Sequence, residues 1–156
     1  KLFVYNMADT SLNENRLSIL IWQTSNIWQS KIRQLLKSSD LTFNEYLILE
    51  TLYKLRLSKS NITQQDICKN SSIDRSVVSL KINILEDKKL LNRFQPKDKR
   101  SYGLILTNSG ILLVESLINS VEKQENLIFD KLGSEIFNFT NSLKLLLGKK
   151  IRIKAK

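Results

Sequence analysis

The residues of this chain that are best suited to chemistry are its cations, and they are unevenly placed. Between residues 69 and 100 there are nine Lys and Arg against four Asp and Glu, a local net charge of +5. The tail 149–156 adds five cations and no acid, whereas the remaining segments sum to neutrality. Clustered Lys and Arg can bind phosphates, because each contact releases counterions condensed on a polyanion. A solvated basic face with a frayed tail is the alternative, and charge alone does not separate the two.

The same inventory excludes most catalytic and metal chemistry. The 156 residues contain no His, so His-based acid–base catalysis, His-dependent triads and His metal sites are absent. Cys68 is the single cysteine, which excludes an internal disulfide and a Cys-rich zinc site. The four glycines form neither a GxGxxG nor a GxxxxGK phosphate loop. We therefore expect no metal, no cofactor and no enzymatic activity, since a hydrolase or transferase would have to work with Asp or Glu alone.

Length and hydropathy are those of a globular protein. The chain fits one domain, or two small ones, and 42% of its residues are hydrophobic. No apolar run approaches the roughly 18 residues of a membrane helix, and the N-terminus lacks a secretion pattern. Together with the single cysteine, these features favour a reducing cytoplasm and no membrane association. Met7 is the only methionine, so residues 1–6 could precede the native start.

Hydrophobic periodicity predicts six helices, at residues 12–37, 43–56, 64–70, 75–88, 109–130 and 134–148. Residues suited to helix starts and ends support these limits: Ser11 with Glu14, Thr42 with Glu45, Thr63, Asp74, Gly133 and Gly148. The segment 91–107 changes to a β pattern around a polar, basic turn containing Pro96, which predicts a β-hairpin.

The resulting order, α-α-α-α-β-β-α-α, predicts a mainly α fold with a winged helix-turn-helix. In that motif the second helix enters the major groove of DNA, and we expect this winged-helix DNA-binding domain at 41–107. The long helices within 12–40 and 108–148 carry more apolar surface than one small motif can bury. We therefore expect these N- and C-terminal helices to form a dimerisation region covered by a twofold partner, followed by the basic tail 149–156.

Three segments, in this order along the chain, are similar to the MarR family of transcription regulators. The segment 98–110, DKRSYGLILTNSG, resembles the family's wing and its connection to the next helix. The segment 74–93, DRSVVSLKINILEDKKLLNR, resembles the recognition helix and the strand after it, and 41–49, LTFNEYLIL, resembles the opening of the second helix. The ordered set is more specific than any one motif, and the resemblance covers about residues 12–148.

The resemblance implies a homodimer built from the first helix and the last two, with a lobe that binds double-stranded DNA. It implies regulation of transcription, as a repressor in our expectation, from a pseudo-palindromic operator. Regulators of this family are often released by a small aromatic or anionic ligand. The alternative is a protein-interaction module on a winged-helix scaffold that has lost sequence-specific DNA binding.

Helix 75–88 has a core side and a side expected to contact DNA. Val78, Ile82 and Leu85 are spaced i, i+4, i+7 and should face the core. Asn can pair with adenine through two hydrogen bonds, Ser can bond bases or phosphates, and Leu can only pack on a thymine methyl. The residues expected on the DNA side are Arg75, Ser76, Ser79, Leu80 and Asn83.

Three positions near this helix depart from the family's pattern. Leu80 stands where the family usually has Arg, Ile84 where a basic residue is frequent, and Lys89 where a glycine ends the helix. Lys81, one position along, is a candidate to compensate for the missing cation. Leu80 and Ile84 are the residues that favour the protein-interaction alternative.

The tip of the predicted wing is basic, with Lys97, Asp98, Lys99 and Arg100 in succession. The resemblance implies that Arg100 enters the minor groove of DNA while Asp98 orients it, with Lys97 and Lys99 as further contacts. A guanidinium suits a narrow, electronegative A·T-rich groove. The alternative is a surface turn with an exposed ion pair of little energetic value.

Four aromatic residues, Trp22, Trp28, Phe43 and Tyr46, come from the first two predicted helices. In the family such residues can line a ligand pocket between the dimer and DNA lobes. Aromatic residues at helical spacing also form ordinary core or dimer interface, and both interpretations stay open. Cys68 is expected to be a buried structural thiol in the third helix, because a reactive thiol needs exposure and thiolate character.

Overall fold

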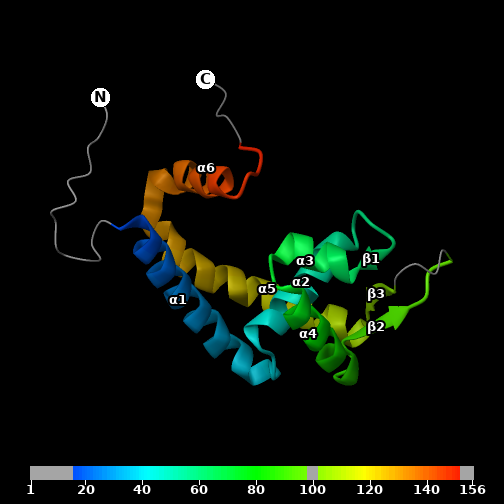
Figure 1. Cartoon of the computed structure of the whole chain (residues 1–156). Coiled ribbons are helices and arrows are strands. Elements are labelled where there is room, and N and C mark those ends of the chain that lie inside the picture. The colour runs from blue at the N-terminus through cyan, green and yellow to red at the C-terminus, as the bar shows by residue number, and fades with distance from the viewer. Residues whose placement is uncertain (1–15, 98–101, 152–156) are drawn as a thin grey trace.

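The fold is a small winged lobe joined to a pair of long helices (Figure 1). The computed structural model describes residues 16–97 and 102–151. The elements are α1 (Leu17–Leu36), the 3-10 turn η1 (Lys37–Ser39), α2 (Phe43–Leu55), β1 (Ile62–Thr63), α3 (Gln64–Ser71), α4 (Arg75–Asp87), β2 (Leu91–Phe94), β3 (Gly103–Leu106), α5 (Asn108–Phe129), η2 (Asp130–Glu135) and α6 (Ile136–Leu146). The mainly α, winged helix-turn-helix fold predicted from the sequence is confirmed, with one short strand added before α3.

Three of the predicted helix starts carry side-chain caps. The Thr42 hydroxyl accepts from the Glu45 N–H at 3.4 Å, and the Glu45 carboxylate accepts from the Thr42 N–H at 3.2 Å. Thr63 and Asp66 form the same reciprocal pair at the start of α3. Asp74 caps α4 by accepting from the Ser76 N–H at 2.8 Å. Each cap satisfies N–H groups that the helix itself leaves unpaired, so the local sequence determines where these helices begin.

The outer helices differ from the prediction at their ends. α1 begins at Leu17 rather than at residue 12, and Arg16 before it makes no side-chain cap. The predicted Ser11–Glu14 capping pair lies outside the described residues. The last helix begins at Ile136 rather than at 134, because Gly133, at φ 51°, interrupts helical geometry within the preceding 3-10 segment.

The wing is a three-stranded antiparallel sheet in the order β1-β3-β2. Leu91 pairs with Leu106 and Phe94 with Gly103, so β2 and β3 form the predicted hairpin. Ile62 and Thr63 pair with Leu104 and Gly103 as the third strand, which the sequence analysis did not predict. Two residues are too few to show an alternating pattern, and β1 depends on the edge that β3 offers.

The core lies where α2, α3 and α4 pack against the sheet and the first half of α5. The predicted inward residues of α4, Val78, Ile82 and Leu85, are fully buried. A Cβ added to Gly110 would lie 2.0 Å from the Leu90 carbonyl oxygen, so only glycine allows α5 to approach the start of β2 this closely. Other fully buried members of this core are Leu36, Ile48, Leu49, Ile67 and Leu91.

Helix α4 ends in a left-handed turn without a glycine. The Leu90 N–H donates to the Leu85 carbonyl at 3.0 Å, and the Lys89 N–H donates to the Glu86 carbonyl at 2.9 Å. This pair of bonds is a Schellman motif, which requires positive φ at Lys89, and its φ is 58°. A side chain at that φ costs roughly 1–2 kcal/mol.

Lys89→Gly should therefore stabilise the protein. Relief of the left-handed strain is partly offset by the greater freedom of glycine in the unfolded chain, about 0.4–1 kcal/mol. The free energy of unfolding in guanidinium should rise by about 0.5–1 kcal/mol. Asp87→Gly, at the exposed last residue of α4 with ordinary helical geometry, is the matched control and should lower stability. Equal losses from both substitutions would contradict this account.

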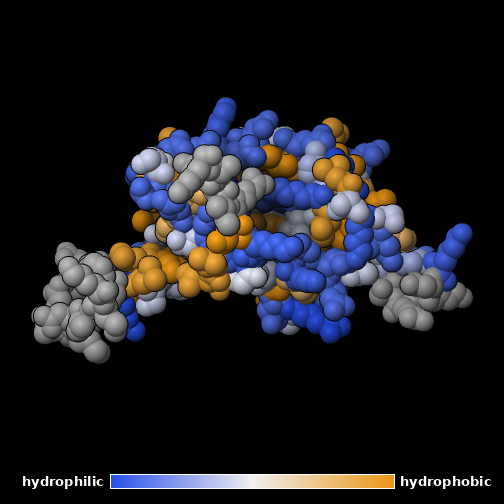
Figure 2. Space-filling view, turned by 90° about the horizontal axis from the view of Figure 1, so that it is seen from above, coloured by the Kyte–Doolittle hydropathy of each residue, from blue (hydrophilic) through white to orange (hydrophobic). Residues whose placement is uncertain are grey.

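α1 and α5 pack against each other as the long arm of the molecule, and α6 runs back from the far end of α5 (Figure 1). Figure 2 shows hydrophobic residues gathered next to the grey N-terminal segment, where α1 begins. The large exposed apolar side chains of these three helices are Leu17, Leu20, Ile21, Trp22, Ile27, Leu112, Leu127, Ile136, Leu145 and Leu146. Among the residues that the structure describes, no helix combines the length and hydrophobicity of a membrane-spanning segment.

Candidate nucleic-acid interface

The outer side of α4, which we call the recognition face, is formed by Arg75, Ser76, Ser79, Leu80 and Asn83. Arg75, Ser76 and Asn83 are exposed and Ser79 is half-buried. Leu80 projects from the middle of this face with 58% of its surface exposed. The Ser76 hydroxyl is engaged by the Asp74 carboxylate at the helix start. Arg75, Ser79 and Asn83 are the polar groups of this face that are best placed to meet a ligand.

Asn83 is held by a neighbour that the sequence analysis did not predict. The Arg93 guanidinium, from β2, donates through Nη2 to Asn83 Oδ1 at 2.5 Å. Its Nη1 pairs with the Glu86 carboxylate, and the Arg93 backbone N–H donates to Glu86 Oε1 at 3.1 Å. Both acceptors lie on α4, three residues apart, so Arg93 ties the wing to the recognition helix.

A groove borders the recognition face on the side of the wing. It has a volume of about 610 Å³ and includes Gln64, Cys68, Arg75, Arg93 and Tyr102 in its lining. Gln64 at the start of α3 donates to the Arg75 carbonyl at 3.2 Å, which fixes the α3–α4 corner. Two guanidinium groups therefore face one groove between α3, α4 and the sheet. Cys68, expected to be buried, is half-buried there and packs against the core.

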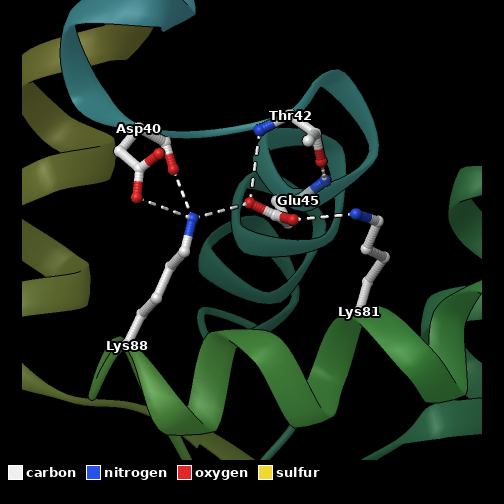
Figure 3. A network of polar contacts seen from close by, with 5 residues as sticks. All are labelled: Asp40, Thr42, Glu45, Lys81 and Lys88. Atoms are coloured by element: carbon white, nitrogen blue, oxygen red, sulfur yellow. Dashed lines mark hydrogen bonds and ion pairs between the residues drawn. The ribbon is translucent and has the colours of Figure 1, made fainter.

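On its opposite flank, α4 is held to α2 by a buried carboxylate (Figure 3). Glu45 is 2% exposed, and its two oxygens accept from Lys81 at 2.9 Å and Lys88 at 3.1 Å. Lys88 also pairs with the Asp40 carboxylate at 3.3 Å. Lys81 is thus turned away from the recognition face. The expectation that Lys81 replaces the missing cation at Leu80 is wrong, because its ammonium group is bound to the Glu45 carboxylate.

The Glu45 pKa is lowered to about 2. Burial acts in the opposite direction and is the largest single effect, but the bonds from Lys81, Thr42 and Lys88 together exceed it. A pKa that is lower in the folded state stabilises the fold above the unfolded value of 4.5. That stability is lost as pH falls from about 4.5 toward 2, and the shift corresponds to about 3 kcal/mol.

Glu45→Gln should consequently destabilise the protein at pH 7 and much less so in acid. The difference in unfolding free energy between wild type and the variant should shrink by about 2 kcal/mol between pH 7 and pH 3. Urea titrations of both proteins at several pH values measure it. Carboxylates other than Glu45 titrate in both proteins and cancel. A difference that does not change with pH would show that the charge of Glu45 is unimportant.

The tip of the wing joins β2 to β3. Lys97, in the loop that follows β2, is exposed and is the last residue described before the tip. Asp98, Lys99 and Arg100, predicted to contact DNA, lie outside the described residues. The last pair of the hairpin before this tip is Phe94 with Gly103.

The four aromatic residues considered as a pocket do not form one group. Trp28 meets Phe43 edge to face, with ring centroids 5.1 Å apart, and its Nε1–H donates to Glu125 of α5 at 3.2 Å. Tyr46 is 1% exposed and belongs to the core. Trp22 is 65% exposed on α1 and is turned away from Trp28, by about 120° around the helix.

Acidic side chains influence the pKa values of the inner part of this cluster. The Tyr46 hydroxyl is buried and makes no hydrogen bond within the described structure. Its pKa is raised by burial and by the carboxylates of Glu50, Glu125 and Glu122. The Glu125 pKa is raised as well, first by burial and then by the charges of Glu50 and Glu122. The hydrogen bond from Trp28 acts in the opposite direction but does not cancel these effects. Lys54 offsets part of this charge through its 2.6 Å ion pair with Glu50. In residues 16–97 and 102–151, no cluster of acidic or Cys side chains could hold a metal.

Comparisons with known proteins agree with this architecture. Residues 41–102 match the model of the MarR family. An uncharacterized HTH-type transcriptional regulator of Bacillus subtilis (strain 168), YdcH, is 30% identical over 129 residues, which cover 82% of this chain and 87% of YdcH. These relatives are regulators rather than enzymes.

Two solved structures of one regulator, MepR of Staphylococcus aureus, are similar to different degrees. The MepR–DNA complex superposes with a TM-score of 0.77 at 28% identity, covering 87% of this chain and 97% of MepR. A further structure of MepR, which is described as a transcription regulator of the multidrug efflux pump MepA, superposes with a TM-score of 0.63 at 28% identity. The match covers 85% of this chain and 96% of MepR. Since the identity is the same, the difference reflects conformation, and this chain has the arrangement that is closer to the one MepR adopts on DNA.

Proposed function

The chain belongs to the MarR family of transcriptional regulators, and on that premise we propose that it acts as a homodimeric repressor on a pseudo-palindromic operator in double-stranded DNA. The recognition face of α4 is proposed to enter the major groove, with Arg75, Ser79 and Asn83 as its polar contacts. The observation that carries the proposal is that these groups lie on the outer side of a helix otherwise fixed on both flanks, with Arg75 and Asn83 exposed. We propose that the protein acts in the cytoplasm, where its DNA target is.

The proposal divides the chain as the sequence analysis did. Residues 41–107 form the DNA-binding domain, 12–40 and 108–148 the dimerisation region, and 149–156 a basic tail. At the wing, Arg100 is proposed to enter the minor groove with Asp98 orienting it, while Lys97 and Lys99 contact phosphates. In a twofold dimer the two recognition helices would bind half-sites about one helical turn apart, ~34–36 Å.

The exposed apolar side chains of α1, α5 and α6 support a partner copy. This number of exposed large apolar side chains on three helices is unusual on a monomer, and burial against an identical copy removes them from water. Apart from Leu112 near the start of α5, these side chains lie on α1, α6 and the far part of α5, so a partner there leaves both recognition faces free (Figure 1).

The test of the function is selection of binding duplexes from a random DNA library by the purified protein, followed by footprinting. We expect a site with inverted half-sites, bound by two chains. Retention of no duplex would favour the second candidate function, a protein-interaction module, for which the exposed apolar side chain of Leu80 is the specific observation.

Leu80→Arg should strengthen DNA binding. The substitution restores a cation in the middle of the recognition face, where one added phosphate contact steepens the dependence of log affinity on log salt by about 0.9 per chain. Leu57→Arg is the matched control. Leu57 is 80% exposed in the turn after α2, so an arginine there adds the same charge away from this face. Titration of the selected duplex at several salt concentrations compares the three proteins. Equal gains from both substitutions would mean that only net charge matters.

A ligand site between α1, α2 and α5 is proposed as the point of regulation. Trp28 and Phe43 offer aromatic surface, and the carboxylates of Glu50, Glu122 and Glu125 act together to raise the pKa of the buried Tyr46 hydroxyl. Of the small aromatic or anionic ligands that the family suggests, an anion is disfavoured among three carboxylates. We propose an aromatic cation, which gains from both the rings and the carboxylates.

The ligand proposal predicts that benzyltrimethylammonium quenches Trp28 fluorescence in a saturable manner, whereas benzoate does not. The measurement uses Trp22→Phe, which leaves Trp28 as the only tryptophan. Glu125→Gln in that background should weaken the cation's binding about five- to tenfold, because one carboxylate is neutralised. Saturable quenching by benzoate instead would reverse the charge that we assign to the ligand.

A further inference from the structure

Arg93 determines which atoms of the Asn83 amide remain free on the recognition face. A guanidinium carries only donors, so the atom of Asn83 that faces it at 2.5 Å must be the amide oxygen. The amide nitrogen, with its two N–H donors, is then left toward solvent on the exposed side of α4. Asn83 is thereby converted from a residue with a donor and an acceptor into one that mainly donates.

The guanidinium is itself fixed, which makes this arrangement more than a chance contact. Glu86 accepts from both the guanidinium and the backbone N–H of Arg93, the latter at 3.1 Å. The backbone of Arg93 is further held by its pairing with Leu104 in β3. Because its backbone and its guanidinium are both held, Arg93 loses little conformational entropy when it bonds to Asn83. It also places a positive charge beside the Asn83 amide.

The four bases differ in what they offer to such a group in the major groove. Guanine presents two acceptors, N7 and O6, whereas adenine presents one acceptor, N7, and one donor, N6–H. The paired contact to adenine needs the Asn83 oxygen, which is already bonded and lies next to a cation that repels a further donor. Resting on the proposed DNA-binding function, we propose that Asn83, positioned by Arg93, selects guanine rather than adenine at one position in each half-site.

Selection from a random DNA library by wild type, Asn83→Ala and Arg93→Met tests this assignment. Wild type should prefer guanine by about tenfold at one position of each half-site, as expected for a well-formed base contact. Asn83→Ala should lose that preference at the same position. Arg93→Met frees the amide oxygen and should move the preference to adenine there. Thermal melts of all variants check folding.

Asn83→Asp gives a second, independent measurement on an exposed residue. Its carboxylate can still pair with Arg93, and its remaining oxygen can only accept, so the preference should move to cytosine, which presents the N4–H donor. Preference of wild type for adenine, or retention of guanine by both Arg93→Met and Asn83→Asp, would overturn the inference while leaving DNA binding intact. Failure of wild type to retain any duplex would instead overturn the proposed function, and this inference with it.

Discussion

A single buried carboxylate, that of Glu45, fixes the recognition helix to the rest of the lobe. It closes the capping box that starts α2 and accepts from Lys81 and Lys88, one near the middle of α4 and one at its end. The same group therefore determines where α2 begins and how α4 lies across it. Because burial of a carboxylate is tolerated only with such partners, the two lysines are structural requirements rather than spare surface charge.

Ion pairs on both flanks of α4 reduce the number of cations in this region that are free to bind phosphate. The sequence assigns +5 to residues 69–100, but Lys81, Lys88 and Arg93 are already bound to carboxylates. The cations that remain for phosphates are those near the ends of α4 and in the wing, such as Arg75 and Lys97. Attraction to a polyanion is thus directed to the edges of the recognition face, while its centre holds Leu80 and a pre-bonded Asn83.

Local chemistry was predictable from the sequence, and contacts between distant residues were not. The caps at Thr42, Thr63 and Asp74 involve residues two or three apart, so spacing alone identified them, and the inward stripe of α4 followed from helical periodicity. The pairs that join Lys81 to Glu45 and Arg93 to Asn83 span elements whose packing no periodicity encodes. In the same way, β1 is too short to show a pattern and exists because β3 leaves an edge beside it. The choice of α4 as the site therefore stays a prediction, and the sequence did not reveal the partners that hold this helix.

The contact of Gly110 with the Leu90 carbonyl makes a stiff joint between the wing and the long arm. Thr107 strengthens the joint, because its hydroxyl donates to the Lys89 carbonyl at 2.7 Å and accepts from the Gly110 N–H at 3.0 Å. From this point α5 extends for 22 residues, ~33 Å at the rise of an α-helix. A rigid rod of that length converts a tilt of about 5° at one end into a displacement of ~3 Å at the other. In the proposed dimer, α5 would therefore convert small movements among the helices at its far end into changes in the separation of the two DNA-binding lobes.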